Sequence, residues 1–267
     1  MNLNKRILVT KFGGAALKEL ENFGRVAEIV LSRKKDYDVV VVVVSAMWQM
    51  TDKLSELAKK VSKNPAKREQ DILLTVGERV SMSLLAMVLE DMGVRAASFT
   101  GSQAGIITNC EHSDAKIVDV RPRRLLPYLD GSRVVIVAGF QGVSEHGDIT
   151  TLGRGGSDTT AVALATALRS EKVEFYKDVE GVFDKDPNCN IDAKHIPHLT
   201  YDEAIRVIEG NKKKLLHPRA LKMAKDNLLP LEILSFHKSQ RKSIIVSEGG
   251  HPLREAIFEV SSAGLNH

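Results

Sequence analysis

The chain has 267 residues, 43% hydrophobic and 27% charged, as expected for a soluble globular protein. A net charge of +4 is too small to indicate nucleic-acid binding, but it suits an enzyme that binds anionic nucleotides. The two cysteines form no CxxC motif. No signal-peptide core precedes Lys11, and the longest apolar run, Val39 to Val44, is far shorter than the roughly 20 residues that span a bilayer. We therefore expect a cytoplasmic protein with free thiols and no membrane partner.

Short β-branched runs alternate with helical patterns in the first half, which is typical of an α/β fold with a mainly parallel sheet. The sequence predicts strands at 7–10 and 39–45, then a strand pair at 96–99 and 106–108. Helices are predicted from the Gly13-Gly14 turn to about Arg33, and over 52–61 and 67–92. Because 39–45 is almost entirely apolar, it is expected to be a central strand covered on both faces.

The second half continues the same alternation. The sequence predicts strands at 134–138, 173–176, 231–234 and 244–246, a hairpin over 143–150 and a helix over 159–168. His217-Pro218 indicates a helix boundary, and Lys212-Lys213-Lys214 a solvated helix start. Without a repeat or a Pro/Ser-rich linker, the pattern favours one domain.

Two glycine-rich turns are candidate anion sites. Lys11-Phe12-Gly13-Gly14 ends the first strand, and glycines there let backbone N–H groups approach a phosphate beside a lysine. Taken alone, it is better explained as an ordinary strand-to-helix turn, and it is no Walker A loop. The run 151–158, TLGRGGSD, opens a helix, and its Arg154 has a planar fork suited to a carboxylate. An ordinary cap does not explain that arginine, so function is favoured.

Two further polar motifs leave both interpretations open. In Gly77-Glu78-Arg79 the glycine lies inside a helical pattern, which usually has a packing or site reason, and Glu78 could meet a substrate ammonium group. Taken alone, a solvated Glu-Arg pair is the simpler interpretation. The loop 177–187 follows a strand, where α/β proteins bind ligands, but a charged surface turn explains it equally well.

In this order, the motifs resemble the aspartate kinase branch of the amino-acid kinase family, over residues 8–246. The resemblance rests on KFGG at 11, SAM…TD from 45, TVGERVS from 75, FTGSQAG from 99, IVDV from 117, VAGFQGV from 137, TLGRGGSDTTAVALATAL from 151 and LHPRA from 216. It implies a three-layer α/β/α sandwich with a mainly parallel central sheet, the amino-acid kinase or carbamate kinase-like fold. It also implies a homodimer and the reaction ATP + L-aspartate → ADP + 4-phospho-L-aspartate, the entry to lysine, diaminopimelate, threonine and methionine biosynthesis.

The resemblance further implies roles for individual residues. Lys11 and Asp158 are implied as catalytic, with Lys11 on the transferring phosphoryl group and Asp158 orienting the lysines. Residues implied to hold aspartate are Thr51, Glu78 (amino group), Arg154 (α-carboxylate) and Ser157. Residues implied to contact ATP are Lys11, Phe12, Gly13, Gly14, Lys177, Asp178, Phe183, Asn188 and Lys214. Mg²⁺ is expected to bind through the nucleotide phosphates, so no protein metal site is predicted.

Several positions depart from the family pattern. Ala15-Ala16 follow KFGG where the family has hydroxyl residues, Trp48 follows SAM, Lys177 replaces a hydroxyl residue and Asn188 replaces an arginine. We expect an active enzyme with an altered nucleotide contact, in which Lys177 can replace the charge missing at Asn188. The catalytic domain is expected over 1–248 and a short tail over 249–267, with no ACT regulatory domain and no feedback inhibition through one.

Two other functions stay open from the residues alone. One is a kinase of the same fold that acts on another acceptor, such as N-acetylglutamate, glutamate or UMP. Glu78 with Arg154 favours a free amino acid as the acceptor, because acetylation removes the ammonium charge. The other is a non-catalytic paralogue that serves as a binding or regulatory subunit, which the departures at Ala15, Trp48 and Asn188 make conceivable.

Overall fold

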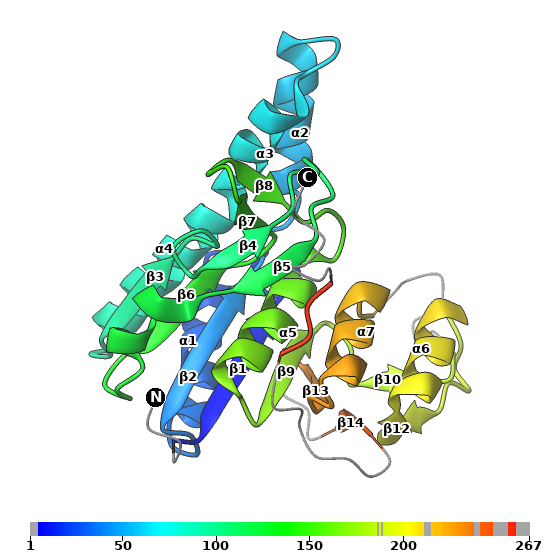
Figure 1. The fold of residues 1–267 in the computed structure, drawn as a ribbon. Coiled ribbons are helices and arrows are strands. Elements are labelled where there is room, and N and C mark those ends of the chain that lie inside the picture. Colours follow the sequence, from blue (N-terminus) through cyan, green and yellow to red (C-terminus); the bar gives the residue numbers. More distant parts are fainter. Residues whose placement is uncertain are drawn as a thin grey trace.

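The computed structural model describes residues 5–185, 187, 189–210, 215–237, 241–247 and 256–259. Its main feature is an eight-stranded sheet with the strand order β12-β14-β13-β9-β1-β2-β6-β3 (Figure 1). The strands are Ile7–Phe12 (β1), Val39–Val44 (β2), Ala96–Phe99 (β3), Val134–Ala138 (β6), Lys172–Lys177 (β9), His198–Thr200 (β12), Leu231–Ser235 (β13) and Lys242–Val246 (β14). All neighbouring pairs are parallel except β13–β14, so the prediction of a mainly parallel sheet is confirmed.

A second, four-stranded sheet has the order β5-β4-β7-β8. Its strands are Ile106–Thr108 (β4), Ile117–Val120 (β5), Gln141–Ser144 (β7) and Ile149–Thr151 (β8). The antiparallel β7–β8 pair confirms the predicted hairpin. The predicted pairing of 96–99 with 106–108 is wrong, because β3 pairs with β6 in the large sheet and β4 pairs with β5 and β7. The short pair Val182–Phe183 (β10) and His195–Ile196 (β11) stands apart.

The helices differ from the predictions mainly at their starts. They are Asn22–Arg33 (α1), Met50–Val61 (α2), Lys67–Leu74 (α3), Val76–Asp91 (α4), Gly156–Leu168 (α5), Tyr201–Gly210 (α6) and Pro218–Asp226 (α7), with 3-10 turns at Pro122–Arg124 and Leu126–Tyr128. The helix predicted directly after Gly14 begins only at Asn22, since residues 14–21 form turns and a bend. The helix predicted over 67–92 is interrupted at Thr75, whose carbonyl oxygen accepts a bond from the side chain of Gln141.

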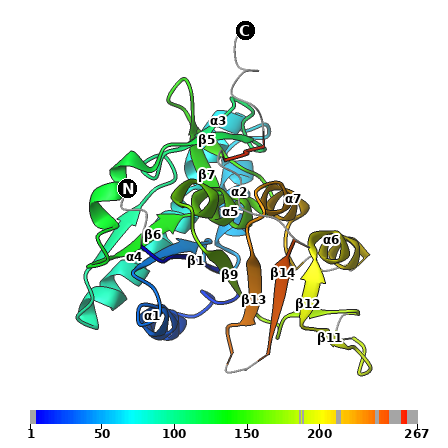
Figure 2. The same ribbon diagram turned by 60° about the horizontal axis from the view of Figure 1, so that its bottom comes forward.

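Two separate apolar cores lie on the two faces of the large sheet. Alternate residues of a strand point to opposite faces. Accordingly, Val40, Val42 and Val44 pack with α1 and α4, whereas Val41 and Val43 pack with α5 and α7. The helices on both sides of the sheet make three layers, so the predicted α/β/α sandwich is confirmed (Figure 2).

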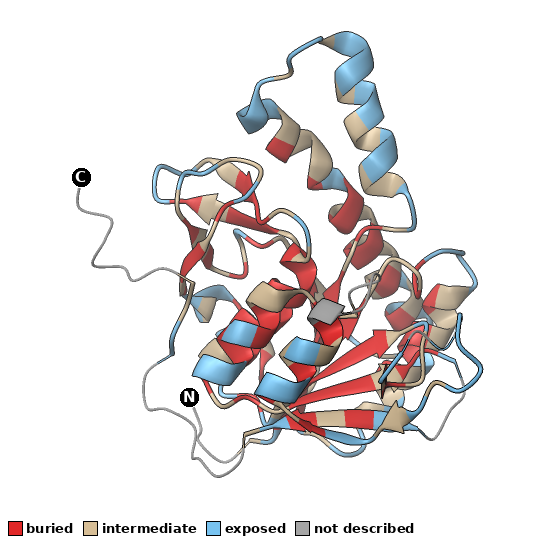
Figure 3. Cartoon of the chain, turned by 90° about the vertical axis from the view of Figure 1, so that its right-hand side faces the viewer, coloured by how far each residue is buried: buried red, intermediate tan, exposed pale blue. Residues whose placement is uncertain are grey.

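The helices α2 and α3 project from this body (Figures 1 and 3). Helix α2 has no buried residue, in contrast to strand β2, which is buried at every residue. The stretch Lys67–Asp91 is long and apolar enough to cross a membrane by length and composition. However, it is two helices, and α4 packs against α1 and the sheet and buries the carboxyl group of Glu78. We therefore interpret α4, the longer of the two, as a core helix of the α/β body.

Candidate active site

The side chain of Lys11, near the end of strand β1, lies in the protein interior. Lys11 precedes the last residue of β1 and is 5% exposed, so its ammonium group needs a buried partner. The chain then turns at Gly13 and Gly14, close to the loop after β2. A Cβ atom at Gly14 would lie 3.0 Å from the carbonyl oxygen of Ala46, and one at Gly13 would lie 3.5 Å from the Lys11 Nζ. Gly14 therefore lets this turn lie close to the backbone of Ala46, whereas a side chain at Gly13 would make an ordinary contact with the lysine.

Asp158 bridges two lysines at this point. Its Oδ1 lies 2.6 Å from the Nζ of Lys11, and its Oδ2 lies 3.3 Å from the Nζ of Lys177, the last residue of β9. Because β9 pairs with β1 in parallel, both lysines lie at the same edge of the sheet. Two ammonium groups around one carboxylate leave a net charge of +1 in a nearly buried place. The first turn of α5, which holds Asp158, adds the positive end of its helix dipole. This arrangement is suited to an anion.

The charges of this cluster depend on pH in different ways. Burial raises the pKa of Asp158, but Lys11 and Lys177 outweigh burial and hold that pKa at about 2. For Lys177 burial dominates and lowers the pKa to about 8, against the opposing charge of Asp158. The carboxylate is thus ionised at neutral pH, and the net positive charge falls as Lys177 loses its proton above about pH 8.

Besides Asp158, the carboxyl group of Glu78 is also buried. Glu78, in the first turn of α4, is 3% exposed, and its Oε1 accepts a hydrogen bond of 3.0 Å from the backbone N–H of Ala46. Its Oε2 has no hydrogen-bond partner in the described part of the chain. Burial raises the pKa of Glu78 to about 8, while backbone N–H groups and the charge of Lys11 pull it down. An unpaired buried carboxyl oxygen suits a ligand that donates hydrogen bonds, an ammonium group above all.

The solvated Glu-Arg pair considered for this motif is therefore wrong. Besides the burial of Glu78, the Nε of Arg79 is buried without a hydrogen-bond partner among the described residues. Gly77 has the packing reason that its helical pattern indicated. A Cβ atom there would lie 2.8 Å from the Cβ of Ala46, so only glycine lets α4 come close enough for the Glu78 contact.

The glycine-rich run before α5 forms a sharp loop. Gly153 (φ +70°) and Gly155 (φ +73°) adopt left-handed conformations that favour glycine, and Gly155 is the N-cap of α5. Arg154 between them is exposed, so its guanidinium is accessible to a ligand from solvent. Ser157 is buried against Gly139, where a Cβ atom would lie only 2.7 Å from the Ser157 Cβ.

Phe140, next to that contact, is one of the residues that sequence reasoning missed. It has φ +69°, an unusual conformation for a bulky side chain, which is held because its carbonyl oxygen accepts from Leu152 N and its N–H donates to Thr160 Oγ1. The missed Ala46 supplies the N–H that holds Glu78. Both positions lie in the motifs VAGFQGV and SAM, on which the resemblance rests. Their side chains are apolar and they act through backbone groups, so the sequence did not indicate them as candidates.

The remaining predicted residues lie in several places. Thr51, half-buried, is the second residue of α2, and Asp178 is exposed just after β9. Phe183 is on β10, in edge contact with the ring of His195 at 5.4 Å. The side chain of Phe12 is fully buried and stacks on Tyr176, so only its backbone could reach a nucleotide. Asn188 and Lys214 lie outside the described residues.

Comparison with known proteins places these features in a family. Residues 6–235 match the amino acid kinase family. The aspartokinase of Geobacillus stearothermophilus is 48% identical over 242 residues, which are 91% of this chain and 59% of that protein. The chain thus spans about three fifths of the length of this curated relative.

Solved structures agree with the sequence matches. The aspartate kinase of Synechocystis superposes with a TM-score of 0.80 at 39% identity, covering 94% of this chain and 41% of that one. Aspartokinase III of E. coli, solved with aspartate and ADP, superposes with a TM-score of 0.81 at 26% identity, covering 92% of this chain and 66% of that one. With the family match over residues 6–235 and the observed fold, this chain belongs to the amino acid kinase family.

Proposed function

We propose that this chain is an aspartate kinase, which transfers the γ-phosphoryl group of ATP to the side-chain carboxylate of L-aspartate. An aspartate carboxylate oxygen forms the new bond to phosphorus, the bond to the bridging oxygen breaks, and ADP leaves. The observation that carries the proposal is the carboxylate-bridged lysine pair Lys11–Asp158–Lys177, with its buried net positive charge. The aspartokinase relatives support the choice of acceptor.

The chemistry asks for positioning and positive charge. The carboxylate of aspartate is ionised at neutral pH and is an adequate nucleophile, so no general base is needed. Negative charge that spreads over the transferring phosphoryl group is stabilised by Lys11 and Lys177. Asp158 fixes where both ammonium groups lie, because each is within ion-pair distance of one of its oxygens.

The acceptor side provides complementary groups for a free amino acid. The unpaired Oε2 of Glu78 would take the ammonium group of aspartate, and this positive charge would favour the ionised form of Glu78. The fork of Arg154 would take the α-carboxylate. Thr51 and Ser157 are proposed to complete the aspartate contacts. An acceptor with an acetylated amino group would leave Glu78 without an ionic partner.

The nucleotide side would use the same edge of the sheet. We propose that Lys11, Gly13, Gly14 and Lys177 contact the phosphates, and that the segment from Asp178 to Phe183 flanks the nucleotide. Asn188 and Lys214 are further proposed contacts. Mg²⁺ is proposed to be held through the phosphate oxygens, since both oxygens of Asp158 already face lysines.

The assembly and location are proposals as well. We propose a homodimer, as the family resemblance implies. The exposed apolar side chains of Leu57 and Val61 on the projecting helix α2 are consistent with it. We also propose a cytoplasmic location, where aspartate and ATP are available.

The proposal is tested by measuring ADP release with MgATP and separate acceptors: aspartate, glutamate, N-acetylglutamate and UMP. Trapping the product as a hydroxamate identifies an acyl phosphate. We expect turnover with aspartate, and Lys11→Ala should lose it. If another acceptor is used, the acceptor assignment is wrong. If ADP or ATP binds but no acceptor turns over, the chain is a non-catalytic paralogue.

A further inference from the structure

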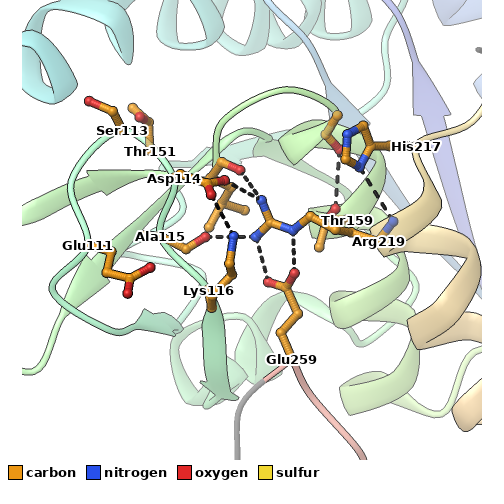
Figure 4. A network of polar contacts seen from close by, with 12 residues as sticks. Glu111, Ser113, Asp114, Ala115, Lys116, Thr151, Thr159, His217, Arg219 and Glu259 are labelled. Atoms are coloured by element: carbon orange, nitrogen blue, oxygen red, sulfur yellow. Dashed lines mark hydrogen bonds and ion pairs between the residues drawn. The ribbon is translucent and has the colours of Figure 1, made fainter.

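Arg219, in the first turn of α7, uses every hydrogen-bond donor of its guanidinium (Figure 4). The side chain is only 17% exposed. Its Nε donates to Glu259 Oε1 (2.5 Å), its Nη1 to Leu152 O (2.5 Å) and Asp114 Oδ1 (3.0 Å), and its Nη2 to Ala115 O (2.8 Å) and Glu259 Oε2 (2.9 Å). An arginine has five such N–H groups in a rigid plane. Their complete use fixes the position of the guanidinium.

Glu259 holds that arginine from a distant part of the chain. Its two oxygens accept from two nitrogens of Arg219, which is the bidentate pairing that gives charged hydrogen bonds their strength. Glu259 is itself held at both ends. Its backbone N–H donates to Ile117 O, and Ile117 N–H donates back to its Oε2. Two residues earlier, Ile257 exchanges hydrogen bonds with the side-chain amide of Asn227 at the end of α7.

The other side of Arg219 contacts the loop that carries Arg154. Leu152 O, which accepts from Nη1, belongs to the residue just before Gly153-Arg154. A Cβ atom at Gly153 would lie 2.8 Å from Asp114 Oδ1, so the loop lies directly on the residue that Arg219 also binds. A Cβ atom at Gly155 would lie 2.2 Å from the ring of His217, the N-cap of α7. The start of α7 thus contacts this loop on both sides of Arg154.

We propose that Arg219, held by Glu259, is a positioning residue that fixes the backbone of the loop at 153–157. Residues 256–259 thereby control how well Arg154 binds the α-carboxylate of the acceptor. This rests on the proposed function only for the identity of the acceptor. Arg154 is exposed, so its reach depends on where the loop backbone is held. A displacement of about 1 Å in a positioning group can cost as much as 100-fold in rate. Lysine cannot replace Arg219, because one ammonium group cannot form the five bonds.

The test compares the wild type with Glu259→Gln and Arg219→Lys. Glu259→Gln keeps the size of the side chain and removes the charge that pairs with Arg219. We expect the KM for aspartate to rise about 10-fold, with the KM for ATP unchanged, since a small displacement of a positioning group can cost up to ~100-fold. Amide hydrogen exchange over residues 152–158 should become faster. Lys225→Gln, which removes an exposed ion pair with Asp202 at the other end of α7, is the matched control and should change neither quantity.

Two results would overturn the proposal. One is a Glu259→Gln protein with a lower melting temperature but wild-type exchange over 152–158 and a wild-type KM for aspartate, which would make the contact merely structural. The other is an equal rise in the KM for both substrates, which would indicate a general loosening. If the wild type itself does not turn over aspartate, the proposed function fails. The exchange rates of the two variants still decide whether Glu259 and Arg219 hold the loop.

Discussion

The two ends of the candidate site differ in how completely their charges are paired before any ligand binds. At the proposed phosphate end, Asp158 is in contact with both Lys11 and Lys177, and its pKa is lowered to about 2. At the proposed acceptor end, Glu78 has one bonded oxygen and one oxygen without a partner among the described residues, and its pKa is raised to about 8. The phosphate end is thus assembled in advance, whereas the acceptor end needs its ligand to complete it. Substitutions at the two ends should therefore have different effects on activity and stability.

The largest effect is expected for Lys11→Ala. Removing one group that stabilises developing charge typically lowers kcat about 100- to 1000-fold, and this substitution also frees Asp158 from its shorter ion pair. The measurement is kcat with saturating aspartate and MgATP. Lys18→Ala removes an exposed lysine and serves as the control. A loss of kcat below about 10-fold would show that Lys11 is mainly structural. The description of the phosphate end as a site for the transferring group would then be wrong.

Glu78→Gln should separate binding from stability. Losing the charged partner of the aspartate ammonium group should raise the KM for aspartate about 10- to 100-fold. The folded-state pKa of about 8 exceeds the ordinary value of 4.5, so Glu78 favours folding when protonated, and the ligand-free protein should lose stability as pH rises from about 5 to about 8. Glutamine does not titrate. The variant should therefore melt higher than the wild type at pH 8 and about equally at pH 5.

Melting curves at the two pH values, with and without aspartate, check this prediction. Addition of aspartate should stabilise the wild type at pH 8 much more than the variant. If the variant melts lower at pH 8, then the carboxylate is satisfied in the free protein, and the contrast between the two ends of the site is wrong.

Lys177 tests how the phosphate end depends on pH. Burial lowers its pKa to about 8, so wild-type affinity for a nucleotide should weaken as pH rises from 7 to 9 and the ammonium group loses its proton. In Lys177→Met the KM for ATP should be about 10-fold higher at pH 7 and should change less over this range. Titrations with MgADP at pH 7, 8 and 9 measure the affinity, and steady-state kinetics at the same pH values measure the KM for ATP. A wild-type affinity that does not change up to pH 9 contradicts the prediction, because a nucleotide contact by Lys177 requires its charge.

The sequence predicts the core of the sheet well, because the pattern there is simple. Strands such as β2 and β6 are apolar at every residue, and their predicted bounds are within two residues of those observed. The region from Val182 to Gly210 was missed. Its strands β10, β11 and β12 have only two or three residues, which leave too few positions for a periodic pattern. The ten-residue helix α6 was not predicted either.

The contacts within the site were only partly accessible from the sequence. Motifs indicated Lys11, Glu78, Arg154 and Asp158 as candidates, but not which groups meet. Lys177 and Asp158 come from different elements, and their contact exists only because β9 pairs with β1 beneath α5. The burial of Glu78 likewise follows from the approach of α4 to Ala46, which a helical pattern with an adjacent arginine does not reveal.

The smallest effect is expected for Arg154→Lys. Arg154 is exposed in the free protein, so its replacement should change neither the melting temperature nor the affinity for MgADP. Lysine keeps the charge but loses the fork, so the KM for aspartate should rise about 5- to 10-fold. Steady-state kinetics and melting curves, with Arg169→Lys at the far end of α5 as control, make the measurement. If Arg154→Lys also destabilises the free protein, then Arg154 already has partners before aspartate binds. The acceptor end would then be assembled in advance like the phosphate end, except for Glu78, whose carboxylate would still need the ligand as its partner.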